Sequence, residues 1–294
     1  MVAGSGRPMR FDRFLSLYLS EPLIGSSRPS RDLKIPILMY HSIAEDLDDT
    51  VPPYYRIVTS PQTFETHMAL LREAGCEVLT LSEAVWRFRS VSGGSSLPGK
   101  PVVITFDDGF RDFHTTAFPI LERFGFRATV FLISGYIDKT LRTGRECLRK
   151  REIQRLATEG VEFGSHTVNH PRLQELSEAA IVHELAASRD AIENIIGTEV
   201  RLFSYPYRFP AEDTRFIRLL SSLLTEQKYS AGVTTVIGSA RASENVLFLK
   251  RLPVNDADDR KLLRAKLTGA YDWVRIGQLL YKRLRRIVSE LRPA

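Results

Sequence analysis

Cysteine is scarce in this chain, which has only Cys76 and Cys147 among its 294 residues. Two cysteines so far apart exclude a disulfide framework and a zinc site built from cysteine. We expect two buried thiols rather than one isolated disulfide. The fold must therefore be stabilised mainly by a hydrophobic core, and an apolar fraction of 43% is ordinary for a globular protein with such a core.

Long hydrophobic runs are also absent. No apolar run approaches the ~18 residues of a membrane span. The N-terminal segment carries Arg7, Arg10 and Arg13, and the apolar run 14–19 that follows is too short and too interrupted for a secretory signal. We therefore expect a cytoplasmic protein, whose contact with a membrane, if any, is peripheral.

Charge of one sign is concentrated at one end of the chain. Residues 275–294 contain six basic residues and one acid, and they contribute +5 of the net charge of +6. The rest is nearly neutral, so the charge gives no indication that the main domain binds nucleic acid. Apolar and basic residues alternate over 271–292, which predicts a basic amphipathic helix. This helix could bind an anionic membrane surface or a partner protein. We favour a third arrangement, in which it packs on the domain and leaves its basic face in solvent.

Strand and helix patterns alternate along most of the sequence. We divide it into a partly mobile N-terminal arm (1–34), a domain (35–256) and a basic helical extension (257–294). The expected strands are 35–40, 77–81, 102–104, 128–133, 161–164, 201–204, 229–234 and 247–254. The expected helices are 61–74, 82–88, 112–124, 150–158, 177–196 and 211–224, of which those at Ser82 and Ser177 begin with a capping serine. Such alternation predicts an α/β fold with a parallel sheet or barrel and helices outside. Its chemistry gathers at the C-terminal ends of the strands.

Two adjacent carboxylates, Asp107 and Asp108, follow the apolar strand 102–104 directly. They cannot both lie in a core, because burying an unpaired charge costs several kcal/mol. Neighbouring side chains on a strand point to opposite faces, so the chain must bend at Gly109 before both acids can share a site. One interpretation is a solvated Asp-Asp-Gly turn. The other is a metal site, in which one acid holds the ion and the other moves protons.

Two histidines follow another predicted strand. His166 and His170 are four residues apart, a spacing at which one segment can supply two imidazoles to one metal. They could also be unrelated loop histidines. Together with an aspartate at a neighbouring strand end, they make a His-His-Asp set with open coordination positions. That set suits zinc best, and also cobalt, nickel, iron or manganese.

The two motifs together resemble a known family. The segments Thr105–Gly109 and Ser165–Pro171, with 36–41 and 203–207, are similar to the polysaccharide deacetylases. These form the NodB-homology domain of carbohydrate esterase family four, and the form of the 203–207 segment is similar to the exopolysaccharide branch. The resemblance covers about residues 35–254. It implies a distorted (β/α) barrel of about seven strands, a divalent metal and hydrolysis of N-acetyl groups on amino sugars.

The resemblance also implies roles for individual residues. Asp108, His166 and His170 would bind the metal, and Asp107 would be the general base. The metal and a backbone N–H near Tyr207 would stabilise the oxyanion.

The sequence departs from the family pattern in its third motif. Ser204 stands where many members carry arginine, and Arg208 stands where they carry glycine. Arg251, at the end of the last predicted strand, could orient Asp107 instead. The alternative for Arg251 is an ordinary surface position beside Lys250.

The family's usual general acid is a late histidine, but all six histidines here precede residue 184. His41, at the end of the first predicted strand, is the best remaining candidate for an acid or supporting role. Its alternative is a structural histidine hydrogen-bonded at the mouth of the barrel.

Three hypotheses about function follow. The first is a metal-dependent deacetylase of a glycan that contains N-acetylhexosamine. The second keeps the fold and changes the bond, as in an O-acetyl esterase or a deformylase acting on a lipid-linked sugar. The third is a glycan-binding module without catalytic activity, against which the intact Asp-Asp-Gly and His-x-x-x-His motifs argue.

Overall fold

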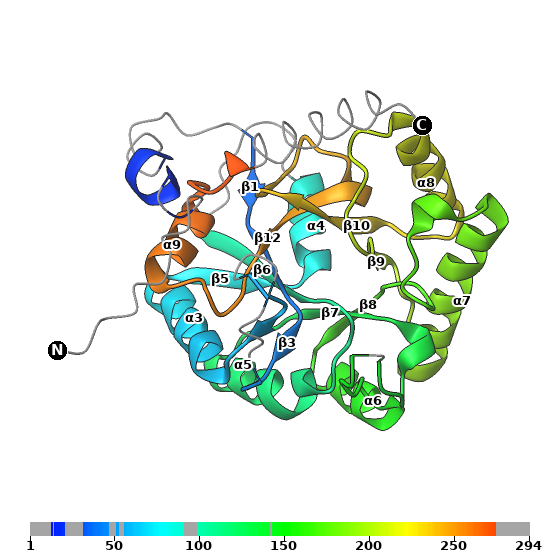
Figure 1. Ribbon diagram of the computed structural model, residues 1–294, viewed down its shortest axis with the longest axis horizontal. Coiled ribbons are helices and arrows are strands. Elements are labelled where there is room, and N and C mark those ends of the chain that lie inside the picture. The colour runs from blue at the N-terminus through cyan, green and yellow to red at the C-terminus, as the bar shows by residue number, and fades with distance from the viewer. Residues whose placement is uncertain are drawn as a thin grey trace.

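Parallel strands alternate with helices along the chain and close into a barrel (Figure 1). The computed structural model describes residues 13, 15–20, 32–46, 51–52, 56–90, 99–141 and 143–274. The strands of the barrel are, in order around the ring, β2 (Ile37–Tyr40), β6 (Lys100–Phe106), β7 (Thr129–Leu132), β8 (Glu162–Ser165), β9 (Leu202–Ser204), β10 (Ala231–Ile237) and β12 (Leu249–Pro253). Every pairing in the ring is parallel, and β12 closes it by pairing with β2. The predicted distorted (β/α)7 barrel is therefore confirmed.

The distortion has visible causes. The contact between β8 and β9 consists of one registered pair, Ser165 with Phe203, and the register of β10 against β12 shifts between Val233 and Ile237. Strand β5 (Cys76–Leu79) pairs with the first half of β6 and stands outside the ring. The short strands β1 (Lys34–Ile35), β3 (Ser42–Ile43), β4 (Val58–Thr59) and β11 (Ala240–Arg241) form two small separate sheets.

Helices surround the barrel, as the periphery of Figure 1 shows. They are α3 (Pro61–Glu73), α5 (Phe118–Phe124), α6 (Lys150–Thr158), α7 (Glu178–Ile196), α8 (Thr214–Glu226) and α9 (Arg260–Thr268). A π-helical turn, η3 (Phe113–Ala117), leads into α5. Three short 3-10 turns are η4 (Ser134–Tyr136) after β7, η5 (Leu173–Glu175) before α7 and η6 (Val246–Phe248) before β12. Helix α4 (Leu81–Ser90) differs, because its apolar residues pack with residues near the N-terminal ends of the barrel strands, such as Ile37 and Leu249. It therefore covers the end of the barrel opposite the catalytic motifs.

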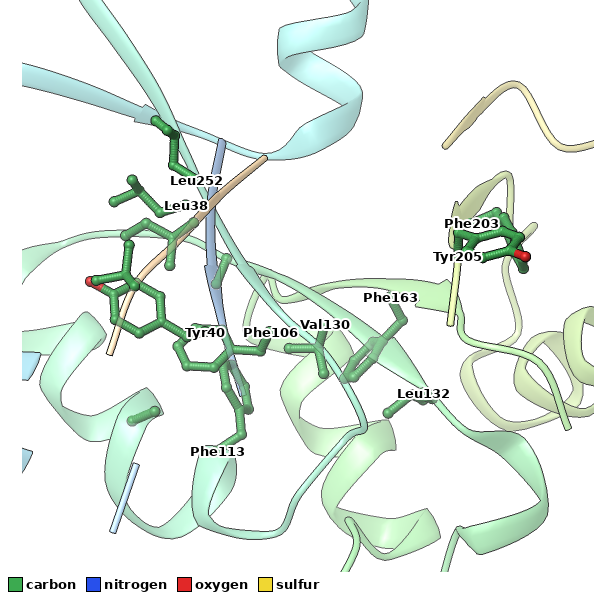
Figure 2. Close-up of a cluster of buried hydrophobic side chains, with 14 of the residues drawn as sticks. Leu38, Tyr40, Phe106, Phe113, Val130, Leu132, Phe163, Phe203, Tyr205 and Leu252 are labelled. Atoms are coloured by element: carbon green, nitrogen blue, oxygen red, sulfur yellow. The ribbon is translucent and has the colours of Figure 1, made fainter. Parts of the chain in front are cut away.

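The side chains of β6 show how the barrel is filled. Val102, Ile104 and Phe106 belong to the larger core between strands and outer helices, part of which Figure 2 shows around Tyr40, Phe106 and Phe113. Val103 packs in the second cluster with residues of other barrel strands. Because successive side chains alternate between faces, the next positions on the Val103 face are Thr105 and Asp107. The strand thus aims Asp107 into the barrel.

Most predicted elements exist with boundaries that differ by a few residues, and the predicted helix 112–124 consists of η3 followed by α5. At two helices the difference lies in the capping residue. Helix α7 begins after Ser177, whose Oγ accepts from the Ala180 N–H at 3.3 Å, and it ends at Gly197 as predicted. Ser82 is not the cap of α4. Thr80 is, because its Oγ1 accepts from the Glu83 N–H at 3.3 Å while the Glu83 carboxylate accepts from the Thr80 N–H. Helix α8 begins three residues later than predicted because Asp213 caps it.

The remaining predictions concern cysteines and chain ends. Both cysteines are free, but only Cys147 is buried, so the prediction of a second buried thiol at Cys76 is wrong. Most of the predicted arm, and the predicted basic helix from residue 275 on, lie outside the described residues. Within the described part, η1 (Ser16–Ser20) contacts α9. Of the helices that can be described, none combines the length and the apolar character that crossing a membrane requires.

Candidate active site

The end of β6 brings both carboxylates into one site. The Asp107 side chain is only 2% exposed, and its N–H donates to the Tyr40 carbonyl at 3.0 Å. Asp108 and Gly109 both have left-handed backbones, with φ of 69° and 66°. The left-handed backbone favours glycine at 109, and a Cβ there would also lie 2.7 Å from Leu132 Cδ2, so the buried leucine would have to shift. The predicted bend at Gly109 is confirmed, and it starts one residue earlier, at Asp108.

The loop after β8 places the two histidines beside Asp108. His166 Nε2 lies 3.5 Å and His170 Nε2 lies 3.6 Å from Asp108 Oδ1. The other ring nitrogen of His166, Nδ1, is 2.7 Å from the Ser204 carbonyl oxygen. Since a carbonyl only accepts, Nδ1 carries a proton, and Nε2 is the ring nitrogen left to bind a metal beside Asp108.

This arrangement fits a divalent metal. One ligand atom from each of Asp108, His166 and His170 lies within 4.8 Å of the others. Two ligands bound to zinc at ~2.1 Å in tetrahedral geometry are about 3.4 Å apart, close to the separations from Asp108. Those separations are too long for hydrogen bonds. Burial, followed by the neighbouring His166 ring, lowers the pKa of His170 to about 3, which keeps its imidazole in the neutral form that binds metals.

Arg251 lies inside the barrel and is fully buried, so the alternative of a surface arginine is wrong. Its Nη1 and Nη2 donate to Asp107 Oδ1 and Oδ2, both at 2.7 Å, in a bidentate ion pair. Burial by itself would raise the pKa of Asp107, but the charge of Arg251, helped by His166, holds it well below its ordinary value. The Asp107 carboxylate therefore stays ionised although it is buried.

Ser204 and Thr105 complete this network. Neither residue was predicted from the sequence to take part in it. Ser204 Oγ donates to Asp107 Oδ1 at 3.2 Å and accepts from Arg251 Nη2 at 3.1 Å. Arg251 Nη1 donates to Thr105 Oγ1 at 3.3 Å. Many family members carry an arginine at the position of Ser204, on β9. Here the serine is small, and the guanidinium beside Asp107 comes from Arg251 on β12. The alternation of faces along β6 and β9 is the signal that could have identified both residues.

Tyr207 lies in a tight turn after β9, with φ of 56°. Thr235 holds this turn, because its Oγ1 donates to the Tyr207 carbonyl at 3.0 Å and accepts from the Phe209 N–H at 2.9 Å. The Tyr207 ring is 48% exposed and its centroid lies 4.3 Å from that of His170. The Tyr207 N–H has no acceptor among the described residues.

His41 follows β2 on the inward-facing series of positions that includes Ile37. It lies near both acids, so a positive charge on its ring would favour the ionised forms of Asp107 and of Asp108, whose pKa burial raises above its ordinary value. Its side chain is partly exposed, and within the described part of the chain it forms no hydrogen bond. The alternative was a structural histidine hydrogen-bonded at the barrel mouth. The described residues provide no hydrogen-bond partner for His41 in that role.

Comparison with known proteins agrees with this geometry. The family model described as polysaccharide deacetylase matches residues 94–223. A putative polysaccharide deacetylase of Bacillus subtilis, YxkH, is 30% identical over 230 residues, which are 78% of this chain and 74% of the relative. The poly-beta-1,6-N-acetyl-D-glucosamine N-deacetylase of Staphylococcus aureus is 26% identical over 163 residues, 52% of this chain and 55% of that protein. This chain thus matches about half the length of the staphylococcal enzyme.

A solved structure shows the same similarity in three dimensions. The Streptococcus pyogenes deacetylase PplD, solved in complex with acetate, superposes with a TM-score of 0.67 at 26% identity. The match covers 80% of this chain and 99% of that one. With the barrel, the two motifs and a relative of which the chain covers nearly three quarters, this chain belongs to the polysaccharide deacetylase family, whose members are hydrolases.

Proposed function

We propose that this protein removes N-acetyl groups from a polysaccharide or glycan precursor that contains N-acetylhexosamine, in a metal-dependent hydrolysis that releases acetate. One observation carries the proposal. The Asp108, His166 and His170 ligand atoms converge within 4.8 Å, directly beside a carboxylate that Arg251 keeps ionised. A glycan-binding module would need neither feature.

The residues of the chain divide the chemistry among them. A divalent cation held by Asp108, His166 and His170 would polarise the acetyl carbonyl and acidify the attacking water. Asp107 accepts a proton from that water as its oxygen bonds to the carbonyl carbon. Arg251 and Ser204 keep the Asp107 carboxylate in one orientation throughout.

The remaining steps use the mouth of the barrel. The Tyr207 N–H donates to the oxyanion that forms on the former carbonyl oxygen. The carbon–nitrogen bond then breaks, the sugar amine takes a proton from His41, and acetate leaves. His41 directly follows β2 and lies near both acids, which supports a place for it at the same end of the barrel.

The names of the relatives suggest the first substrate to test. The staphylococcal relative is a poly-beta-1,6-N-acetyl-D-glucosamine N-deacetylase, so we propose β-1,6-linked N-acetylglucosamine as the repeating unit. Chitin oligomers, which have the same sugar in β-1,4 linkage, are the matched comparison.

The test is acetate release from both oligomers by metal-free protein reloaded separately with zinc, cobalt, nickel, manganese or iron(II). We expect release that depends on metal and is abolished in Asp108→Asn. Asp190→Asn, at an exposed position on α7, is the control and should behave as wild type. Equal release by Asp108→Asn, or by chelated protein, would contradict the proposal, and release of formate or of O-linked acetate would favour the second hypothesis.

A further inference from the structure

We propose that Glu184, on helix α7, is a positioning residue that holds the loop between His166 and His170 in its metal-binding conformation. This inference rests on the proposed metal-dependent function. It concerns a residue outside both sequence motifs, whose hydrogen bonds in the described part of the chain go to Val168 and Asn169 and not to the metal ligands. Glu184 is only 6% exposed, although glutamate is rarely buried without a partner.

Among the described residues, the carboxylate of Glu184 accepts hydrogen bonds from the loop between the two histidines. Its Oε2 accepts from the N–H groups of Val168 and Asn169 at 2.8 and 3.0 Å. Its Oε1 accepts from Asn169 Nδ2 at 2.7 Å. All three donors lie between the two histidines, so Glu184 fixes the segment that sets their separation.

A carboxylate suits this place better than another side chain would. An ionised carboxylate only accepts hydrogen bonds, and in the described structure all three of its hydrogen-bond partners are N–H donors. Two of these donors belong to the backbone and cannot turn away. An apolar side chain at 184 would leave both without their partner in a buried site, where an unmade hydrogen bond is costly.

The loop needs such a restraint because its backbone is strained. Thr167 and His170 have φ of 68° and 54°, in the left-handed region that residues with a Cβ avoid. Such conformations persist only where the surroundings hold them. Ser188 lies one turn after Glu184 on the same face of α7, and its Oγ donates to the Thr167 carbonyl at 3.1 Å.

The loop is also held by η4. The Gly135 N–H donates to the Val168 carbonyl at 2.9 Å, and a Cβ on Gly135 would lie 2.5 Å from that oxygen. Both η4 and α7 therefore hydrogen-bond to the backbone of the loop. Without Glu184 the loop loses three hydrogen bonds on the α7 side, and the two Nε2 atoms lose their fixed separation.

The test is the zinc affinity of the full chain, measured by competition with a chelating dye, and the visible absorption spectrum of the cobalt-loaded protein. Loss of a residue that supports a metal ligand typically weakens metal binding about 10- to 100-fold. We expect zinc affinity to fall by this factor in Glu184→Ala, and the absorption bands of the cobalt-loaded variant to change. Glu184→Gln should retain most of the affinity. Its amide oxygen can accept from the two backbone N–H groups, and Asn169 can turn its own amide to match the new NH2.

The matched control is Glu193→Ala. Glu193 lies on the same helix and accepts from the Val200 N–H at 2.8 Å, away from the histidine loop. It should lower the melting temperature without changing zinc affinity. If Glu184→Ala does not fold, Asn169→Ala replaces it, because this variant removes only the Asn169 side-chain contact and should still weaken zinc binding.

The outcomes separate the two proposals. Equal zinc affinity in wild type and Glu184→Ala, or in wild type and Asn169→Ala when that variant is used, overturns the role of Glu184 and leaves the proposed function standing. An equal loss in Glu193→Ala overturns it too, since the effect would then be general destabilisation of α7. A wild-type protein that binds no zinc and gives no cobalt spectrum overturns both.

Discussion

The ion pair between Arg251 and Asp107 offers the sharpest test of how the barrel interior is stabilised. Arg251→Met removes the guanidinium and keeps a side chain of similar length. Asp107, 2% exposed, then keeps only the Ser204 hydroxyl, at 3.2 Å, of the side-chain donors that the structure shows for it. A buried carboxylate that has lost its partner must either stay charged at high cost or take up a proton.

The expected magnitude follows from this geometry. Removing one partner of a buried ion pair typically costs about 3–5 kcal/mol, and this pair is bidentate and fully desolvated. A whole domain is usually stable by only about 5–15 kcal/mol, so the variant should fold with a strongly reduced margin. Adding Asp107→Asn removes the orphaned charge, and the double variant should recover about 2–3 kcal/mol relative to the sum of the single changes.

The assay is urea unfolding of wild type, both single variants and the double variant, with a chelator present to exclude any metal contribution. Arg201→Met is the control, because it breaks an exposed pair with Glu199 and should cost at most about 1 kcal/mol. If the single effects add to within about 0.5 kcal/mol, the two side chains are not coupled and the reasoning fails. It also fails if Arg251→Met costs no more than Arg201→Met.

Three further predictions concern His41, His67 and Gly109. His41→Asn should lower kcat for deacetylation by about 10²–10⁴-fold, and a change confined to KM would argue against an acid role. In buried His67, Nε2–H donates to the Asp258 carbonyl and Nδ1 accepts from the Tyr40 hydroxyl. Burial lowers its pKa, so its stabilisation is complete above the unfolded pKa of about 6.5 and is lost as pH falls below it. The melting temperature of His67→Gln should therefore fall less than that of wild type between about pH 7 and 5, and equal slopes would refute this. Gly109→Ala should cost at least about 2 kcal/mol in urea unfolding, from its left-handed backbone and the contact with Leu132, and a neutral effect would show that the turn adapts.

The two motifs could be found from the sequence because their chemistry is local. Asp107 and Asp108 follow one strand, and His166 and His170 follow another. In a parallel α/β fold the C-terminal ends of the strands meet at one edge. Their positions at the ends of predicted strands, together with the family resemblance, were therefore enough to predict that these residues meet. The structure confirms that Asp108, His166 and His170 converge.

Other residues could not be placed in this way. Arg251 and Asp107 are 144 residues apart, and whether an arginine in a short strand faces the core or the solvent depends on how β12 is registered when the barrel closes. From the sequence, Glu184 resembles any glutamate in a helix, because the residues around it do not indicate which loop will pack against α7. The cap at Thr80 was missed because Ser82, two residues later, is an equally good cap by composition.

The sequence by itself thus determined the fold class, the family and the residues that could bind a metal. The fold class follows from the alternation of strand and helix patterns along the chain, and the other two follow from short local motifs. Only the tertiary structure decided how the charges inside the barrel are balanced. Ion pairing and hydrogen bonding act over a few ångströms, and only the closed ring brings Arg251, Ser204 and Asp107 within that range. The same holds for Glu184, whose three hydrogen bonds exist only once α7 has packed against the histidine loop.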